Sequence, residues 1–572
     1  MAGPGMREMR SIAERRANLD ARTPRWNALT LHQALDDAAA RFAARPFVIT
    51  EARQWTYAEI VSWSKRLANG LKRSGVSSGD KVAIILANYP EFVALKFAIS
   101  RLGAVAVPLN FLNRRDELRY LLGQSDTVLL VTMDCFRGND FLGALDEIAL
   151  GWEQENGGTA LPKLANILVF PTGEIELRAG VTLFESLDDG TEAADFAVDP
   201  SAVCDIIYTS GTTGPPKGVL LTHDMLTRTA FGAAYSRAFD DGQRVIFALP
   251  MFHVYGYVEG MLAVPWVGGA IIPQLRFEAE TMLRAIERHR ATDALLIPAM
   301  TLDLIDAARN GTYDLSSLHF VISSGARAPE RVWRELREVL GVFEITTGYG
   351  MSETTATTML TLPDDSFDRL LTTNGRPRNV GPAGDPAQGG RLVTYRTIDE
   401  RSGEQVADGE IGELVAKGLG VTAGYYNNLE ATAAAFGRDG WLRTGDLGRF
   451  DADGYLSLAG RSKESYRCGG EQVLPTEIED LFTTLPDILQ AQVVPIPDER
   501  MGEVGVAFIV PAPGTSVDVE ALRALAIDRL ARFKVPRHFL IVGESDIPTT
   551  ASGRARKFLL AELAMKMLGL SG

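Results

Sequence analysis

The feature that most constrains the fold is an alternation of short apolar runs with amphipathic segments between about residues 30 and 350. The segments between the runs, such as residues 90–103 and 277–290, have the apolar spacing of helices. The runs are rich in β-branched residues and include 82–86, 128–132, 167–170, 205–208, 245–250, 294–298 and 319–325. Continuous apolar runs of this length are typical of strands buried on both faces of a parallel sheet. The pattern therefore predicts an α/β fold built on parallel sheets.

The pattern changes after about residue 375. As far as residue 460, Gly and Asp interrupt short strand-like runs, which favours a small antiparallel, barrel-like unit. Beyond it, a helix-strand-strand-helix-strand succession predicts a compact α+β domain. A chain of 572 residues is long enough for three or four folding units. We therefore expect an N-terminal domain over residues 1–460 and a C-terminal domain over residues 461–572.

The overall charge excludes one broad class of partner. There are 58 Lys and Arg residues against 73 Asp and Glu residues, a formal net charge of −15. Binding to nucleic acid depends on basic side chains that neutralise phosphates, so we expect no nucleic-acid partner.

Cysteine spacing and hydropathy point to an ordinary intracellular protein. The three cysteines, Cys135, Cys204 and Cys468, lie far apart, and their spacing indicates neither a zinc site nor a disulfide framework. The first residues lack the apolar stretch of a signal peptide. No apolar run reaches the roughly 18 residues that a membrane span needs. We therefore expect a cytoplasmic protein without a membrane span.

The strongest local signal is the segment 208–218, Tyr-Thr-Ser-Gly-Thr-Thr-Gly-Pro-Pro-Lys-Gly, which follows a predicted strand. Glycines let backbone N–H groups approach phosphate oxygens, hydroxyl side chains add donors, and a lysine adds positive charge. No Ser or Thr follows the lysine directly, so this is not a Walker loop. The segment predicts a phosphate-binding loop made by Thr209, Ser210, Gly211, Thr212, Thr213, Gly214 and Lys217.

Further segments accompany this loop in a fixed order. They are 248–253, 324–326, 349–353, 443–446, 460–463 and 469–470, the last followed by 475–479. With the loop, they resemble the adenylate-forming superfamily, which includes acyl-CoA synthetases, luciferases and peptide-synthetase adenylation domains. The resemblance runs from about residue 55 to residue 557.

The resemblance implies an architecture and a reaction. The large N-terminal domain would hold two parallel-sheet α/β subdomains and a β-barrel-like subdomain, and the small C-terminal domain would be mobile. Ligases of this kind first join a carboxylic acid to ATP, which gives an acyl-adenylate (acyl-AMP) and pyrophosphate. After a domain rotation, the thiol of coenzyme A (CoA) attacks the acyl-AMP. Oligomeric state, including a homodimer, stays open.

The resemblance also implies a nucleotide site. The loop residues would hold the triphosphate, and Glu353 would bind Mg²⁺, which prefers carboxylate and phosphate oxygens. Asp446 would accept hydrogen bonds from the ribose hydroxyls, and Arg461 would contact the sugar or a phosphate. The remaining nucleotide-binding candidates, some of which would flank the adenine, are Gly325, Ala326, Tyr349, Gly350 and Ser352.

The acyl end of the site is predicted less sharply. His253 follows a predicted strand, at a position where amino-acid-activating relatives tend to carry an Asp for the substrate ammonium. A histidine there argues against an amino acid and favours contact with the substrate carboxylate. The acyl pocket candidates are Tyr255, Gly256, Thr301, Gly348 and Met351, and the glycines would leave room for a bulky acid.

The C-terminal segments carry the elements of the second step. Lys463 corresponds to the hinge about which the small domain would rotate. Cys468, Gly469 and Gly470 would border the tunnel for the CoA arm, where missing side chains keep a narrow path open. Cys468 need not be a nucleophile, because a free Cys is usually a small hydrophobic residue.

One residue departs from the family pattern. The last motif of the family reads Pro-x-Thr-x-x-Gly-Lys, whereas residues 548–554 read Pro-Thr-Thr-Ala-Ser-Gly-Arg. Arg554 therefore stands where the family has the lysine that bridges substrate carboxylate and α-phosphate during adenylation. Arginine keeps the charge but presents a wide planar fork instead of a compact ammonium. A misplacement of about 1 Å at such a site costs on the order of 10²-fold in rate.

Three functional interpretations follow. In the first, the enzyme makes a CoA thioester from acyl-AMP that a separate adenylating enzyme supplies, like the non-adenylating acyl-CoA ligase of platensimycin- and platencin-type diterpenoid biosynthesis. In the second, it is a complete ATP- and Mg²⁺-dependent synthetase, with Arg554 or Lys557 standing in for the lysine. In the third, it binds acyl-AMP without catalysis. The identity of the carboxylic acid is not predicted.

Overall fold

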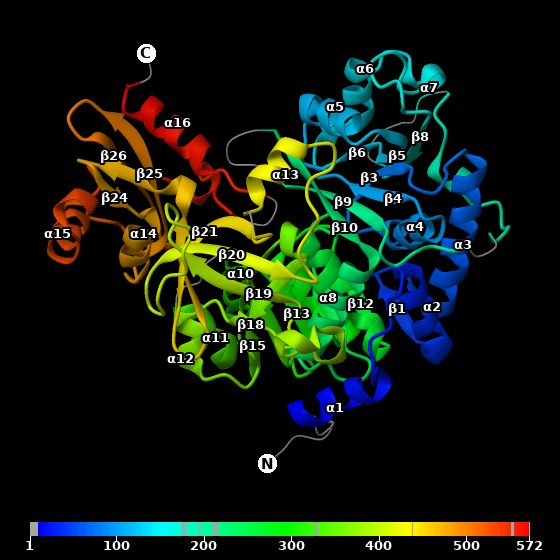
Figure 1. Ribbon diagram of the computed structural model, residues 1–572, viewed down its shortest axis with the longest axis horizontal. Helices are drawn as coiled ribbons and strands as arrows, with labels where there is room; N and C mark the ends of the chain where they lie inside the picture. Colours follow the sequence, from blue (N-terminus) through cyan, green and yellow to red (C-terminus); the bar gives the residue numbers. More distant parts are fainter. Residues whose placement is uncertain are drawn as a thin grey trace.

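The computed structural model of the 572-residue chain describes residues 10–173, 178, 180–193, 196–209, 215–325, 330–437, 439–550 and 554–570. Two large sheets form its centre (Figure 1). The six-stranded sheet has the order β10 (Lys217–Thr222), β9 (Val203–Thr209), β4 (Val105–Pro108), β3 (Lys81–Ile85), β5 (Thr127–Met133) and β8 (Asn166–Phe170). All its pairings are parallel except that of β9 with β10.

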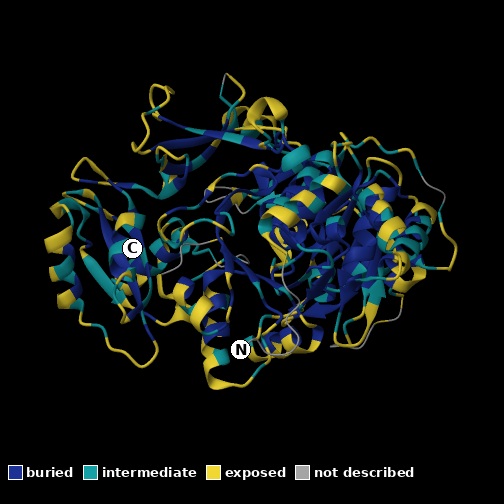
Figure 2. Cartoon of the chain, turned by 90° about the horizontal axis from the view of Figure 1, so that it is seen from below, coloured by how far each residue is buried: buried dark blue, intermediate teal, exposed yellow. Residues whose placement is uncertain are grey.

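The seven-stranded sheet is parallel except at one edge, where β1 and β2 pair antiparallel. Its order is β15 (Glu344–Thr346), β14 (Phe320–Ser323), β13 (Asp293–Leu296), β11 (Arg244–Phe247), β12 (Ala270–Pro273), β1 (Pro46–Ile49) and β2 (Gln54–Thr56). The predicted α/β fold with two parallel-sheet subdomains is therefore confirmed. Strands β3, β11 and β13 begin one residue before the apolar runs that predicted them, and β14 lies within its run. Most residues of these strands are buried, as is much of the interior of the molecule in Figure 2.

Helices cover these sheets, and local signals fix where several of them begin. A capping box opens each of α1 (Ile12–Arg22), α2 (Leu31–Phe42) and α3 (Tyr57–Arg73). Helices α4 (Pro90–Arg101) and α8 (His223–Ser236) are buried over most of their length. The outer helices include α5 (Arg115–Gln124), α6 (Phe141–Ile148), α7 (Trp152–Glu155), α9 (Ala279–His289), α10 (Pro298–Asn310), α11 (Glu330–Glu338) and α12 (Phe367–Thr372).

Antiparallel strands follow, as the change of sequence pattern after about residue 375 predicted. Strands β16 (Gly348–Met351), β17 (Ala356–Leu360) and β18 (Arg376–Pro377) form one sheet. A meander of β19 (Val393–Ile398), β20 (Gly412–Gly418), β21 (Leu442–Phe450) and β22 (Leu456–Arg461) forms another, and α13 (Leu429–Ala435) lies between two of its strands in sequence. The last strand of the meander, β22, ends at Arg461, where the C-terminal part begins.

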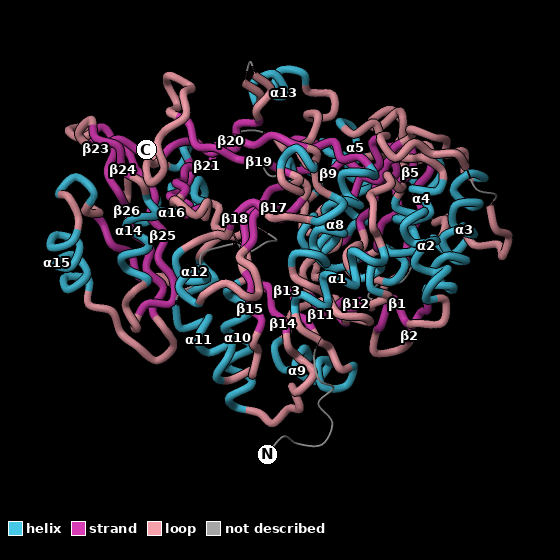
Figure 3. The backbone as a smooth tube through the Cα atoms, turned by 60° about the horizontal axis from the view of Figure 1, so that its bottom comes forward, coloured by secondary structure: helices cyan, strands magenta, loops and turns pink. Residues whose placement is uncertain are grey.

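The C-terminal residues form a separate α+β unit with its own hydrophobic core. Its sheet contains β23 (Tyr466–Cys468), β24 (Glu471–Val473), β25 (Ile488–Asp498), β26 (Gly502–Pro511) and β27 (His538–Ile541). The helices are α14 (Pro475–Thr483), α15 (Val519–Arg529) and α16 (Lys557–Met567). Figure 3 shows these strands grouped away from the two large sheets. Among the described residues, no helix is long and apolar enough to cross a membrane.

Candidate active site

The ends of the predicted phosphate loop are held by a hairpin. Thr209, the last residue of β9, pairs with Lys217, the first residue of β10. Residues Ser210, Gly211, Thr212, Thr213 and Gly214 lie outside the described residues. The Lys217 Nζ lies 5.0 Å from the centre of the Tyr425 ring, a cation–π distance that places this amine beside the segment 422–428.

Glu353 lies in a short 3₁₀ turn, Ser352–Thr354, which follows β16. The next two residues, Thr355 and Ala356, both have positive φ, 59° and 80°. Left-handed conformations cost non-glycine residues about 1–3 kcal/mol each and gather at functional sites. The Glu353 side chain is buried, and its Oε1 accepts a 2.9 Å hydrogen bond from the Tyr425 hydroxyl. Burial raises the pKa of the Glu353 carboxyl.

Glu353 fits a magnesium ion through the chemistry of its donor group. Mg²⁺ usually takes one or two protein carboxylates together with substrate phosphates and water. Within the described part of the chain, no group of three or more His, Cys, Asp or Glu side chains is arranged to hold a metal ion. A cation at Glu353 would therefore share this carboxylate with the phosphates of a bound nucleotide.

Asp446 joins two other predicted nucleotide-binding residues. The Tyr349 hydroxyl donates a 2.6 Å hydrogen bond to Asp446 Oδ2, and the Arg461 Nε lies 2.7 Å from Oδ1. Strand β21 supplies the aspartate, and the end of its partner β22 supplies the arginine. Gly325 stands at the end of β14 with φ 97°, and Ala326 is outside the described residues.

His253 is held as a neutral imidazole. Its Nδ1 accepts a 3.2 Å hydrogen bond from the Tyr255 N–H, which leaves the ring proton on Nε2. Burial lowers the pKa of His253 to about 4. The residue precedes a π-helix, Tyr255–Met261, a type of turn that is common at functional sites. His253 can therefore donate from Nε2 to a substrate oxygen but carries no positive charge near pH 7.

Two of the acyl-pocket candidates, Tyr255 and Thr301, form hydrogen bonds at the ends of strands. The Tyr255 hydroxyl donates to the Leu296 carbonyl at 3.1 Å, and the Thr301 and Ser323 hydroxyls lie 2.9 Å apart. Both side chains are buried among protein atoms. They join the carboxyl ends of β13 and β14 to the π-helix and to α10.

The glycines of this region have a structural explanation that needs no ligand. A Cβ on Gly256 would lie 2.7 Å from the Leu249 carbonyl oxygen, and a Cβ on Gly348 would lie 2.4 Å from that of Met359. Gly350 is tighter still, because its Cβ would lie 1.8 Å from the carbonyl oxygen of Ala356. These glycines allow close backbone contacts, including those that pair β16 with β17. Met351 follows them, with its Sδ 4.0 Å from the Tyr349 hydroxyl.

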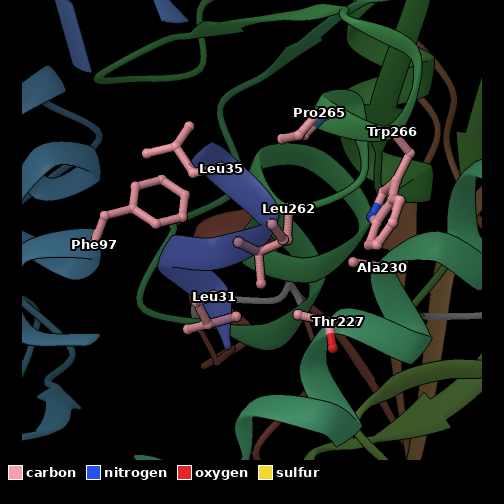
Figure 4. A pocket seen from close by; sticks show the side chains of 9 residues that line it. Leu31, Leu35, Phe97, Thr227, Ala230, Leu262, Pro265 and Trp266 are labelled. Carbon is pink, nitrogen blue, oxygen red and sulfur yellow. The ribbon is translucent and has the colours of Figure 1, made fainter. Parts of the chain in front are cut away.

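An apolar cavity lies apart from these residues, between α2, α4 and α8 (Figure 4). Its volume is about 10 Å³, and its lining includes Leu35, Phe97 and Trp266. That space is about the room of one water molecule, so it does not accommodate an acyl group.

The hinge candidate and the predicted tunnel residues lie on consecutive short elements. Lys463 is exposed in the 3₁₀ turn Ser462–Glu464, directly after β22. Gly469 and Gly470 connect β23 to β24 with φ of 63° and 89°. A two-residue hairpin turn with positive φ at both positions demands such residues, so the turn itself explains this pair. Cys468 is buried, and burial raises the pKa of its thiol.

Arg554 makes an ion pair within the C-terminal part of the chain. Its Nη2 donates to Glu464 Oε1 at 2.6 Å, and its backbone N–H donates to the Thr550 hydroxyl. Lys557 begins α16, and its Nζ lies 2.7 Å from Glu479 and 3.6 Å from Glu464. Glu464, the residue that follows Lys463, therefore pairs with both cations.

Tyr425 and Glu464 are contacts that sequence reasoning missed. Tyr425 belongs to the run Gly-Tyr-Tyr-Asn at 424–427, which stands outside the motifs that carry the resemblance. Glu464 directly follows the hinge candidate. Its acidic side chain beside Lys463 was the one sequence signal that could have drawn attention to it.

Comparison with known proteins identifies the family. The family model for AMP-binding enzymes matches residues 35–426, and the model for the C-terminal domain of AMP-binding enzymes matches residues 477–554. A putative acyl-CoA synthetase of Bacillus subtilis is 33% identical over 557 residues, which cover 95% of this chain and 98% of that protein. An indoleacetate–CoA ligase of Aromatoleum aromaticum is 34% identical over 511 residues, covering 88% and 92%.

A solved structure agrees with these relatives. The o-succinylbenzoate–CoA synthetase of Bacillus subtilis, in complex with its acyl-adenylate intermediate, superposes with a TM-score of 0.75 at 27% identity. The match covers 92% of this chain and 97% of that one. The chain therefore belongs to the AMP-binding, adenylate-forming family and is an acid–thiol ligase of the acyl-CoA synthetase type.

Proposed function

We propose that this ligase transfers the acyl group of an acyl-adenylate to CoA and that its own adenylation half-reaction is weak or absent. The observation that carries the proposal is the state of Arg554. It replaces the adenylation lysine of the family pattern, and its guanidinium is hydrogen-bonded to Glu464. To act on a substrate carboxylate, the side chain must share or leave this partner.

Lys557 is a poor substitute for the missing lysine. Its ammonium lies between Glu464 and Glu479, and the exposed fraction of its side chain is only 13%. Moving it to a substrate would break both ion pairs and leave the mostly buried Glu479 carboxylate without its ammonium partner, which is costly.

The sequence keeps the residue types that the family pattern has for the second half-reaction. Asp446 and Arg461 would bind the adenylate, and the His253 Nε2–H would donate to an oxygen of the acyl phosphate group. The CoA thiol would lose its proton and attack the acyl carbonyl carbon, so that a C–S bond forms, the C–O bond to phosphate breaks and AMP leaves. We further propose that residues 461–572 rotate about Lys463 between the steps and bring the Cys468–Gly470 turn to the site.

The complete synthetase remains the second candidate, favoured by Lys217 and Glu353. Lys217 offers a positive charge and Glu353 a buried carboxylate, both in contact with Tyr425, and a solved relative contains ATP and magnesium. In that case Mg²⁺ and ATP are cofactor and substrate, together with the free acid and CoA. The non-adenylating ligase proposed first instead needs acyl-AMP from a separate enzyme.

The first test supplies synthetic acyl-AMP and CoA and measures the thioester by chromatography. Because relatives act on medium-chain acids, indoleacetate and ferulate, the probes are the adenylates of octanoate, indoleacetate and ferulate. We expect CoA thioester from at least one of them. Binding of an adenylate without thioester from any of them would instead identify an inactive acyl-AMP-binding protein.

A further inference from the structure

Tyr425 contacts two groups of the proposed nucleotide site at once. Its hydroxyl donates to Glu353 Oε1 at 2.9 Å, and its ring lies 5.0 Å from the Lys217 Nζ. The two contacts use different parts of one side chain. Tyr425 therefore links the carboxylate suited to Mg²⁺ with the lysine at the end of the phosphate loop.

The backbone around Tyr425 is fixed from several sides. The Leu220 N–H donates to the Gly424 carbonyl at 3.1 Å, and the Tyr426 N–H donates to the Gly218 carbonyl at 2.8 Å. The Tyr425 N–H itself donates to the Thr432 hydroxyl at 3.0 Å. The segment is thus attached along β10, the strand that Lys217 begins. A ring held this way has little freedom to leave its two partners.

Glu353 also receives a backbone restraint from the same segment. The Thr422 N–H donates to the Glu353 carbonyl at 2.8 Å, close to the two residues with positive φ. One segment therefore holds both the backbone and the carboxylate of Glu353. The carboxylate keeps further lone pairs for a cation while Oε1 accepts from Tyr425.

We propose that Tyr425 is a positioning residue that orients Glu353 for Mg²⁺ through its hydroxyl and holds Lys217 beside the phosphate loop through its ring. This role extends beyond the proposed function and does not depend on Arg554. It concerns binding of the nucleotide and metal, and it holds whether the enzyme forms the adenylate or only receives it.

The test separates the two contacts with two substitutions. Tyr425→Phe removes the hydroxyl and keeps the ring, whereas Tyr425→Leu removes both. Calorimetry measures binding of a non-hydrolysable ATP analogue at a series of Mg²⁺ concentrations and in EDTA. A hydrogen bond to a charged group contributes about 1.5 kcal/mol, which corresponds to roughly a tenfold change in binding. We expect Tyr425→Phe to raise the half-saturating Mg²⁺ concentration by about tenfold without changing binding in EDTA.

Tyr425→Leu should show the same Mg²⁺ shift and also bind the analogue more weakly in EDTA. The matched control is Tyr426→Phe, which removes the neighbouring hydroxyl, bonded to Asp126 at 3.0 Å and not to Glu353. That control should match the wild type. In a Glu353→Gln background, Tyr425→Phe should have no further effect on Mg²⁺ dependence.

The proposal is overturned if Tyr425→Phe and the wild type share one Mg²⁺ dependence, or if Tyr426→Phe shifts as much. It is equally overturned if the wild type binds the analogue independently of Mg²⁺. Thermal melting of each variant identifies loss of folding, and a Mg²⁺ shift that appears only with a lowered melting temperature counts against a positioning role. Failure of the proposed function, seen as robust adenylation, changes none of these isotherms.

Discussion

At the scale of single residues, the ion pair of Arg554 with Glu464 decides how the missing lysine is interpreted. Glu464 is mostly buried beside the hinge candidate and accepts from one nitrogen of a wide guanidinium. A lysine at this position would present a compact ammonium whose reach and hydration differ. We therefore expect Arg554 to alter the geometry that adenylation needs even though the charge is retained.

The first prediction restores the family residue. Arg554→Lys should raise pyrophosphate release from acid and ATP by on the order of 10²-fold, because the ammonium can approach the reacting oxygens. Thioester formation from acyl-AMP should stay within about twofold of wild type. Arg556→Lys is the control, since the Arg556 guanidinium lies over the Phe558 ring. An equal change in both half-reactions would show that Arg554 acts through folding or domain motion.

A buried histidine predicts how stability depends on pH. Burial lowers the pKa of His223 to about 3, while the unfolded chain has the ordinary value near 6.5. Between these pH values His223 is protonated in the unfolded chain but neutral in the folded chain. The free energy of unfolding therefore falls as pH falls from about 6.5 towards 3. Each such proton contributes a slope of about 1.4 kcal/mol per pH unit.

The matching variant is His223→Asn, whose side-chain oxygen can accept the N–H bond that Leu31 donates to His223 Nδ1. Denaturant unfolding at pH 7, 6 and 5 should show a shallower loss of stability in the variant than in the wild type. Parallel pH profiles for the two proteins would rule out this role for His223.

At the scale of elements, the β16–β17 hairpin depends on Gly350. A Cβ there would lie 1.8 Å from the Ala356 carbonyl oxygen, a contact that neither strand can relieve by moving a side chain. Gly350→Ala should therefore destabilise the protein by more than about 3 kcal/mol. Gly454→Ala is the control, because that residue has φ 78° but no heavy atom within 4 Å, and left-handed strain costs about 1 kcal/mol.

Melting temperatures test this contrast. Gly350→Ala should melt well below Gly454→Ala, or fail to fold, whereas similar melting temperatures would contradict the packing explanation. Fluorescence of the seven tryptophans gives a simple readout.

The elements also show what could be predicted from sequence and what could not. Strands such as β3 and β14 were predictable because both faces are buried, which leaves continuous apolar runs. Asp446 was proposed for the nucleotide and the hydroxyl-rich loop for phosphate because both lie in local motifs, and these roles stay predictions. Tyr425 was not, because its partner Glu353 is 72 residues away and the contact exists only when β10 brings both together. The glycines of the pocket region, which were predicted to leave room for a bulky acid, also allow close backbone contacts.

At the scale of the whole molecule, the described residues form two hydrophobic cores under the parallel and antiparallel sheets of the large part and a third in the C-terminal unit. A unit with its own core can move as a body while the rest keeps its fold. The proposed boundary between residues 460 and 461 falls at the end of β22, whose last residue, Arg461, pairs with Asp446. Rotation about Lys463 would leave Asp446 and its partner Arg461 in place and change which C-terminal segment faces the adenylate.

The most direct measurement of the central claim compares two rates for the same enzyme preparation. One is pyrophosphate release from a carboxylic acid and MgATP, and the other is CoA thioester formation from the synthetic adenylate of the same acid. We expect thioester formation to exceed pyrophosphate release by on the order of 10²-fold. Pyrophosphate release as fast as thioester formation would contradict it and identify a complete synthetase.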